Sequence, residues 1–196
     1  MKKHKIYCIV GKSGSGKDTI TREIVKKSKL KEIPRCTTRP KRKEEVEGRE
    51  YHFLDKKDKD EMICQTVFHT KHGDWYYGFT KEPLDENNDY IAVMNLEQVL
   101  DIIDIYQEKF KICVFNIITD EETRIIHLID REDRNGRDYD EVCRRIRTDA
   151  YDFSEKNSAY RDVHKKADVY YELYNDYEST PEEIAADWDY AYRYYK

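Results

Sequence analysis

The chain carries Gly11-Lys12-Ser13-Gly14-Ser15-Gly16-Lys17-Asp18-Thr19 directly after the short apolar run Ile6–Val10. Apolar side chains then recur at helical spacing from Ile20 to Val25. A glycine-rich loop between a strand and a helix is the arrangement that a phosphate-binding P-loop requires. Its glycines let backbone N–H groups curl around a polyphosphate, and the positive end of the helix faces the same anion. The pattern therefore predicts a site for polyphosphate, with Lys17 as a point charge on the outer phosphates.

The residue after this lysine departs from the usual motif. A Ser or Thr whose hydroxyl meets Mg²⁺ is usual there, whereas this chain has Asp18 followed by Thr19. Either Thr19 supplies the hydroxyl or Asp18 reaches the metal through water, because magnesium accepts carboxylate and water ligands. We therefore expect Mg²⁺ at Thr19 or Asp18. The residues predicted to bind the polyphosphate in this loop are Gly11, Ser13, Gly14, Ser15, Gly16, Lys17, Asp18 and Thr19.

The composition indicates one domain with a heavily charged surface. The 196 residues suffice for a sizeable core, and 39% of them are charged. No apolar run approaches the ~20 residues that a membrane span needs, and we expect no signal peptide. Five scattered cysteines without a C-x-x-C pair indicate reduced thiols and a cytoplasmic protein. The net charge of −5 argues against nucleic acid as a partner.

Four short apolar runs predict the parallel strands of an α/β core. They lie at residues 5–10, 90–95, 111–117 and 168–173 and are separated by helical patterns. Capping signals at 119–122 and 180–183 open two helices, and apolar spacing predicts another from Tyr139 to about Phe153. We expect a P-loop three-layer fold with a parallel sheet.

Two segments interrupt this rhythm of strands and helices. Residues 35–89 are polar and crowded with charges, which favours a subdomain inserted at the carboxyl edge of the sheet, where open α/β folds bind ligands. Residues 130–138 hold three arginines around Asn135-Gly136, which indicates a mobile loop. We therefore predict a single domain over residues 1–196. Its core comprises 1–34, 90–129 and 146–196, with one insert at 35–89 and a second at 130–145.

The insert opens with a basic run, Arg35-Cys36-Thr37-Thr38-Arg39-Pro40-Lys41-Arg42, and continues to Tyr51. Two guanidinium groups with a tyrosine hydroxyl can hold a dianionic phosphate. Judged by charge alone, such a run is more often a solvated surface loop. The basic run therefore needs a second signal before it indicates a site.

The order of the motifs supplies that signal, because it resembles the guanylate kinase family. The G-x-x-G-x-G-K loop comes first, and the tyrosine-glycine motif Tyr76-Tyr77-Gly78 follows the insert's opening string. Arg134 and Arg145 are spaced like two lid arginines of the family, and residues 168–176 resemble the strand and turn against which adenine rests. The resemblance covers about residues 5–176, and it implies that the insert at 35–89 binds the monophosphate and that residues 130–145 form a lid. Its opening string comprises Thr37-Thr38-Arg39-Pro40, Arg42, Glu45, Gly48, Tyr51 and Phe53.

This resemblance implies phosphoryl transfer from ATP to a nucleoside monophosphate, with Mg²⁺, and GMP or dGMP is the best single expectation for the acceptor. The implied catalytic residues are Lys17, Arg131, Arg134 and Arg145, and Asn175 joins the ATP site. The implied acceptor residues are Arg39, Arg42, Glu45, Tyr51, Tyr77, Thr80 and Asn95. Two alternatives stay open: a non-catalytic binding module of this family, and a P-loop kinase for another phosphate monoester. The presence of Lys17 and the lid arginines counts against the first.

Residues that read the base in the family are missing here. Arg35 stands where a serine helps to hold the acceptor, and residues 67–70 lack the glutamate that reads guanine. Asn95 ends a run that is Asp-x-Asp in the family. The position after Gly78 commonly holds a small hydroxyl residue in the family; here it is Phe79, and Thr80 comes next. A neutral amide accepts a hydrogen bond less strongly than a carboxylate. The sequence therefore predicts a retained grip on phosphate and weak discrimination between bases.

Overall fold

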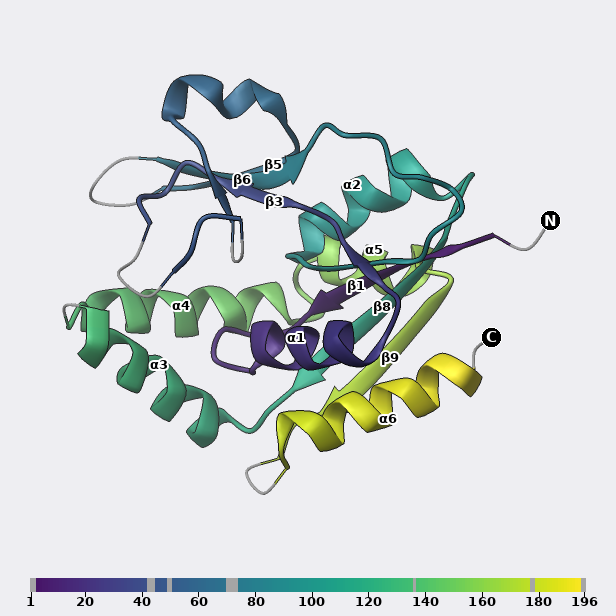
Figure 1. The fold of residues 1–196 in the computed structure, drawn as a ribbon. Coiled ribbons are helices and arrows are strands. Elements are labelled where there is room, and N and C mark those ends of the chain that lie inside the picture. Colours follow the sequence, from purple (N-terminus) through teal and green to yellow (C-terminus); the bar gives the residue numbers. More distant parts are fainter. Residues whose placement is uncertain are drawn as a thin grey trace.

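The computed structural model describes residues 3–41, 45–48, 51–69, 74–135, 137–176 and 179–194. Five strands form a parallel sheet in the order β2-β7-β1-β8-β9. The four predicted apolar runs lie side by side in this sheet, and β1 runs parallel to β8, so the predicted parallel core is confirmed (Figure 1). The strands are β1 (Lys5–Val10), β2 (Lys31–Glu32), β7 (Tyr90–Val93), β8 (Lys111–Ile118) and β9 (Val169–Tyr174).

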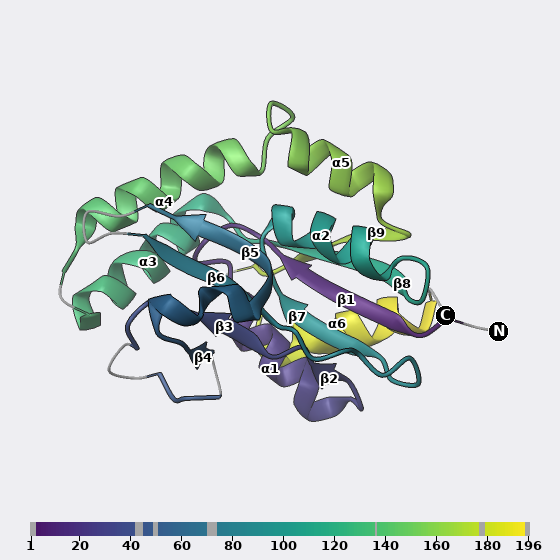
Figure 2. The ribbon, with the colours of Figure 1, turned by 90° about the horizontal axis from the view of Figure 1, so that it is seen from above.

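The central sheet is covered by helices on both faces, and alternate residues of β1 serve the two layers (Figure 2). Ile6, Cys8 and Val10 pack in the layer of α2 (Leu96–Tyr106) and α5 (Ser158–Lys166). Tyr7 and Ile9 pack in the layer of α1 (Lys17–Lys27) and α6 (Pro181–Tyr194). Because every residue of β1 is buried, the loop that follows it starts from a firmly packed strand.

A second sheet lies within the segment where the strand–helix rhythm stops. Its four strands are ordered β4-β3-β6-β5, and β3 pairs antiparallel with β6. Gln98 connects α2, which packs on the central sheet, to the second sheet, because its Nε2 donates to the carbonyl oxygens of Cys64 in β5 and Tyr77 in β6. The elements are β3 (Arg35–Thr37), β4 (His52–Phe53), the 3₁₀ helix η1 (Lys56–Glu61), β5 (Met62–Phe68) and β6 (Trp75–Thr80).

Two antiparallel helices, α3 (Glu121–Asn135) and α4 (Tyr139–Asp152), project from the end of the sheet to which β1 points (Figure 1). The mobile loop predicted for residues 130–138 is therefore wrong over 130–135, which form the end of α3. Three of these residues, Arg131, Glu132 and Arg134, are good helix formers, and the buried side chains of Leu128 and Glu132 hold the inner face of the helix. Among the described helices, none combines the length and the apolar character that crossing a membrane requires.

Candidate functional site

A cavity of about 940 Å³ opens at the carboxyl end of β1. The glycine-rich loop (residues 11–17), the second sheet and the α3–α4 pair all contribute to its walls. Its volume lies in the range of small-molecule sites. Most of the predicted site residues meet here, and Arg42 lies outside the described residues. Those that line the cavity are Gly11, Ser13, Gly14, Gly16, Lys17, Asp18, Thr19, Arg39, Glu45, Tyr51, Tyr77, Asn95, Arg131, Arg134, Arg145 and Asn175.

The glycine-rich loop passes too close to its neighbours for side chains at Gly11, Gly14 and Gly16, and a Cβ at Gly11 would lie 2.7 Å from the carbonyl oxygen of Ile117. Gly14 has φ +81°, and a Cβ there would lie 2.6 Å from the carbonyl oxygen of Arg124. Gly16 has φ +86°, and a Cβ would lie 2.8 Å from Nδ2 of Asn175. Such backbone angles and spacings favour glycine. The loop is thus held between α3 and the turn after β9.

Lys17 curls back over the glycine-rich loop. Its Nζ donates to the carbonyl oxygens of Gly11 at 2.7 Å and Lys12 at 2.8 Å. Burial lowers the pKa of Lys17 to about 8, although the nearby carboxylates of Asp18 and Asp149 oppose this shift. The ammonium group therefore lies over the loop as a largely protonated cation at neutral pH.

Ser15 differs from its predicted role at the nucleotide. Its side chain is fully buried outside the cavity, and its N–H donates to the carbonyl oxygen of Lys12. The carbonyl oxygen of Ser15 accepts from Thr119 Oγ1 and from Asn175 Nδ2. Ser15 is thus a structural residue of the loop, and Asn175 supports the loop from the turn after β9.

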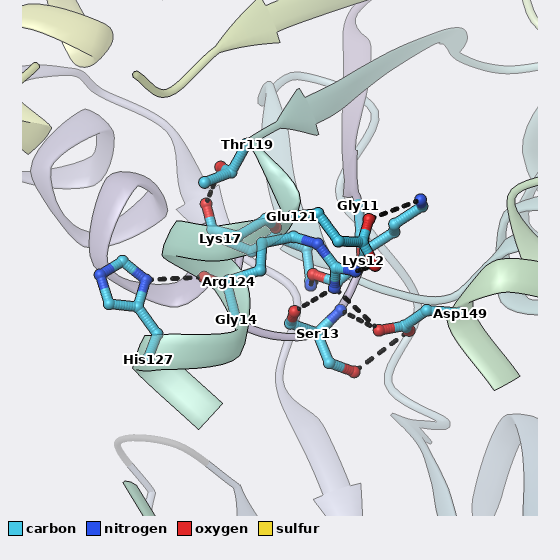
Figure 3. Close-up of polar contacts among 11 residues, drawn as sticks. Gly11, Lys12, Ser13, Gly14, Lys17, Thr119, Glu121, Arg124, His127 and Asp149 are labelled. Atoms are coloured by element: carbon cyan, nitrogen blue, oxygen red, sulfur yellow. Dashed lines mark hydrogen bonds and ion pairs between the residues drawn. The ribbon is translucent and has the colours of Figure 1, made fainter. Parts of the chain in front are cut away.

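A buried ion pair that the sequence does not reveal fastens the loop to α3 and α4 (Figure 3). Arg124 is 1% exposed, and its Nη1 donates to the carbonyl oxygen of Ser13 and to Oδ2 of Asp149. Asp149 in turn accepts from the N–H of Ser13 at 2.8 Å and from its hydroxyl. Glu121 adds a second carboxylate at 3.0 Å from Arg124 Nη2. Both helices of the pair are therefore connected to the glycine-rich loop by charged hydrogen bonds.

The predicted metal residues lie at the start of α1, at the cavity. Asp18 is paired with Arg35 of β3, whose Nη1 lies 3.0 Å from Asp18 Oδ1. Burial would raise the pKa of Asp18, but Arg35 and Lys17 outweigh it and hold this pKa below its usual value. Thr19 is exposed at the same wall. The described residues contain no cluster of three or more His, Cys, Asp or Glu side chains that could hold a metal by itself.

The predicted grip on the acceptor phosphate is assembled around Arg39. Its Nε donates to the Tyr77 hydroxyl at 3.1 Å, and its Nη2 donates to Glu45 Oε1 at 2.6 Å. Tyr51 packs edge-on against Tyr77, with the ring centroids 5.7 Å apart. Arg39 is 4% exposed, so Glu45 fixes its orientation and compensates its charge. The structure thus brings together four of the predicted acceptor residues.

Two other predicted acceptor residues lie differently. Thr80 lies outside the cavity, because side chains alternate along β6 and those of Trp75, Tyr77 and Phe79 take the inner face. Asn95 lines the cavity but caps α2, where its Oδ1 accepts from the N–H of Gln98. Its Nδ2 donates to Thr66 Oγ1, so both ends of the amide are engaged within the protein.

Arginines of α3 and α4 form the remaining wall. Arg131 and Arg134 come from α3, and Arg145 comes from α4 together with Arg144, which the sequence did not single out. Glu141 holds the two arginines of α4: Arg144 donates from Nε and Nη2, and Arg145 from Nε at 2.7 Å. The i, i+3 and i, i+4 spacing from Glu141 is a signal that could have predicted this cluster.

Glu141 should make stability depend on acid pH. Burial would raise its pKa, but Arg144 and Arg145 outweigh burial and lower the pKa to about 2 from 4.5. Because the pKa is lower in the folded state, ionised Glu141 stabilises the fold fully above pH 4.5, and this stabilisation is lost as the pH falls towards 2. We expect Glu141→Gln to cost on the order of 2 kcal/mol at pH 7, and less at pH 3 than at pH 5. Urea unfolding measures this, with exposed Glu122→Gln as control; a difference independent of pH would contradict it.

The fold and this cavity define an α/β protein with a second sheet and a helical pair over a glycine-rich loop. A family model described as "Guanylate kinase" matches residues 3–112. The chain is 30% identical to the guanylate kinase of Mycoplasmoides gallisepticum over 147 residues, which are 71% of this chain and 72% of that protein. The chain belongs to the guanylate kinase family.

Other relatives match shorter stretches. Identity is 30% over 114 residues to the guanylate kinase of Clostridium tetani and 35% over 120 residues to that of Caldanaerobacter subterraneus. The matched parts are 55% and 56% of those proteins, so the chain spans about half the length of these relatives. The crystal structure of guanylate kinase from Anaplasma phagocytophilum has a TM-score of 0.63 at 17% identity. The alignment covers 98% of this chain and 86% of the Anaplasma phagocytophilum chain. The two chains therefore share their fold beyond residue 112 as well.

Proposed function

We propose that this chain transfers the terminal phosphoryl group of ATP to GMP or dGMP. The observation that carries the proposal is one cavity that is lined by two kinds of phosphate-binding group. Lys17 and the glycine-rich loop suit a polyphosphate, and Arg39 with Tyr51 and Tyr77 suits a phosphate monoester. The comparisons support this substrate pair and do not favour a non-catalytic module or a sugar kinase.

The reaction asks for alignment and charge compensation more than for covalent chemistry. An oxygen of the acceptor phosphate attacks the γ-phosphorus of ATP, and the bond to the β,γ-bridging oxygen breaks, which gives GDP and ADP. Lys17 neutralises charge on the outer phosphates, and Arg131, Arg134 and Arg145 supply cations for the transferred group. Arg39 orients the nucleophile through its fixed guanidinium group.

The donor set at the start of α1 fits Mg²⁺. One carboxylate, of Asp18, and one hydroxyl, of Thr19, lie at the same wall, and Mg²⁺ commonly takes one or two carboxylates together with substrate phosphates. Asp18 and Thr19 would hold the ion, which neutralises phosphate charge when bound. We further propose a cytoplasmic protein without a nucleic-acid partner. All five cysteines are unpaired and four are buried, in keeping with a reducing compartment.

Arg39→Ala tests the acceptor site. Because Arg39 meets the phosphate and not the base, we expect the apparent KM to rise by a similar factor, about tenfold or more, for GMP, dGMP, AMP, CMP, UMP and dTMP. Steady-state rates with ATP and Mg²⁺ measure this, and Lys41→Ala is the matched control because Lys41 is exposed outside the cavity. A KM change confined to guanine nucleotides would assign Arg39 to the base and contradict the proposal.

A further inference from the structure

Arg35 connects the two halves of the cavity. It stands at the start of β3 in the second sheet, and its Nη1 reaches Asp18 in the first turn of α1 at 3.0 Å. Its guanidinium carbon also lies 4.8 Å from the centroid of the Tyr51 ring. The side chain is 13% exposed, and Arg35 lines the cavity. One arginine therefore touches the donor side and the acceptor side together.

The hydrogen bonds of Arg35 distinguish it from Arg39. The guanidinium group of Arg39 donates to Pro40, Glu45 and Tyr77 and is thereby fixed in place. Arg35 has five N–H donors, and the bond to Asp18 uses one of them. Arg35 can therefore change its partner more readily than Arg39 can. A phosphate dianion at Tyr51 would offer it more acceptors than Asp18 does.

Asp18 can also exchange its partner. Its side chain is 57% exposed, and it stands at the position where a P-loop contributes a metal ligand. Its carboxylate cannot serve Arg35 and a divalent cation equally well, because the two cations compete for the same negative charge. The donor nucleotide and Arg35 are thus alternative partners of Asp18.

We propose that Arg35 is a further arginine of the acceptor site beside Arg39, and that Asp18 restrains it until the donor binds. Asp18 turns to the Mg²⁺ of the donor nucleotide, and the released Arg35 pairs with the acceptor phosphate beside Tyr51. This inference rests on the proposed function. It makes the two substrates bind cooperatively, since each one favours the same exchange of partners and such coupling is reciprocal.

Calorimetric titration with GMP tests the exchange without turnover. In the wild type, we expect saturating Mg²⁺ and a non-hydrolysable ATP analogue to tighten GMP binding about tenfold, and the analogue without Mg²⁺ to tighten it less. In Asp18→Asn, GMP should bind more tightly than to the wild type when no donor is present. In this variant the ATP analogue with Mg²⁺ should tighten GMP binding by less than about twofold, because Arg35 is already free. Arg35→Gln should bind GMP more weakly than the wild type does, both with and without the donor.

The controls separate this exchange from general closure of the cavity. Glu23→Gln removes another acid of α1, which pairs with Lys26 away from the cavity, and should keep the tenfold coupling. Full coupling in Asp18→Asn, or GMP affinity unchanged in Arg35→Gln, overturns the inference and leaves the proposed function standing. A wild-type protein that does not phosphorylate GMP overturns both.

Discussion

Lys17→Ala is expected to lower kcat/KM for GMP with ATP about 10³-fold or more. Lys17 carries the cation that lies over the glycine-rich loop. Removal of a preorganised group that stabilises charge in the transition state lowers the rate by about this factor. The fold should persist, because burial already lowers the pKa of Lys17 to about 8 and so disfavours its charge in the folded state.

Initial rates of GDP formation measure the effect, and circular dichroism checks the fold. Lys27→Ala is the matched control, because Lys27 belongs to the last turn of the same helix and lies outside the cavity. If the activity of Lys17→Ala stayed within threefold of the wild type, the glycine-rich loop would not be the donor site.

Arg124→Met is expected to destabilise the protein by about 3 kcal/mol, because it leaves Asp149 buried without its cation. Asp149→Asn should cost less, since the neutral amide can still accept from Ser13 and carries no charge to bury. The double variant Arg124→Met/Asp149→Asn should recover at least half of the loss from Arg124→Met alone. It removes both charges and leaves neither of them unpaired.

Urea unfolding of the four proteins gives this cycle, and exposed Arg22→Met is the control on α1. The same variants report on the donor site. In Arg124→Met the uncompensated carboxylate lies at Ser13, beside the expected phosphates, so ATP binding should weaken more than in the double variant. Additive losses of stability in the cycle would show that the two side chains do not act as a pair.

The central sheet was predictable because its strands are buried on both faces. Such strands are continuous apolar runs, and the predicted run 5–10 coincides with β1. The end of α3 was missed because its polar residues carry little apolar periodicity, and helix propensity is a weak signal against a cluster of charges. In the second sheet, β3 and β4 have only three and two residues, and the sequence located this sheet only as a polar interruption.

The site was predictable where a local motif carries it and unpredictable where distant residues meet. The glycine-rich loop and the Arg39 string each lie within a few residues, whereas Arg124 and Asp149 come from different helices and follow no shared pattern. Asn95 and Gln98 have the spacing of a capping box, so the capping role of Asn95 could have been read from the sequence. The alternation along β6 could likewise have excluded Thr80.

The most direct test of the account is product analysis with the wild-type chain, GMP and γ-labelled ATP in the presence of Mg²⁺. The account predicts that the label appears in GDP in step with ADP formation, and that omission of GMP leaves little release of inorganic phosphate. It also predicts that dGMP, when it replaces GMP, is converted to a labelled diphosphate. Release of label as inorganic phosphate without labelled diphosphate, or labelling of no nucleoside monophosphate at all, would contradict it.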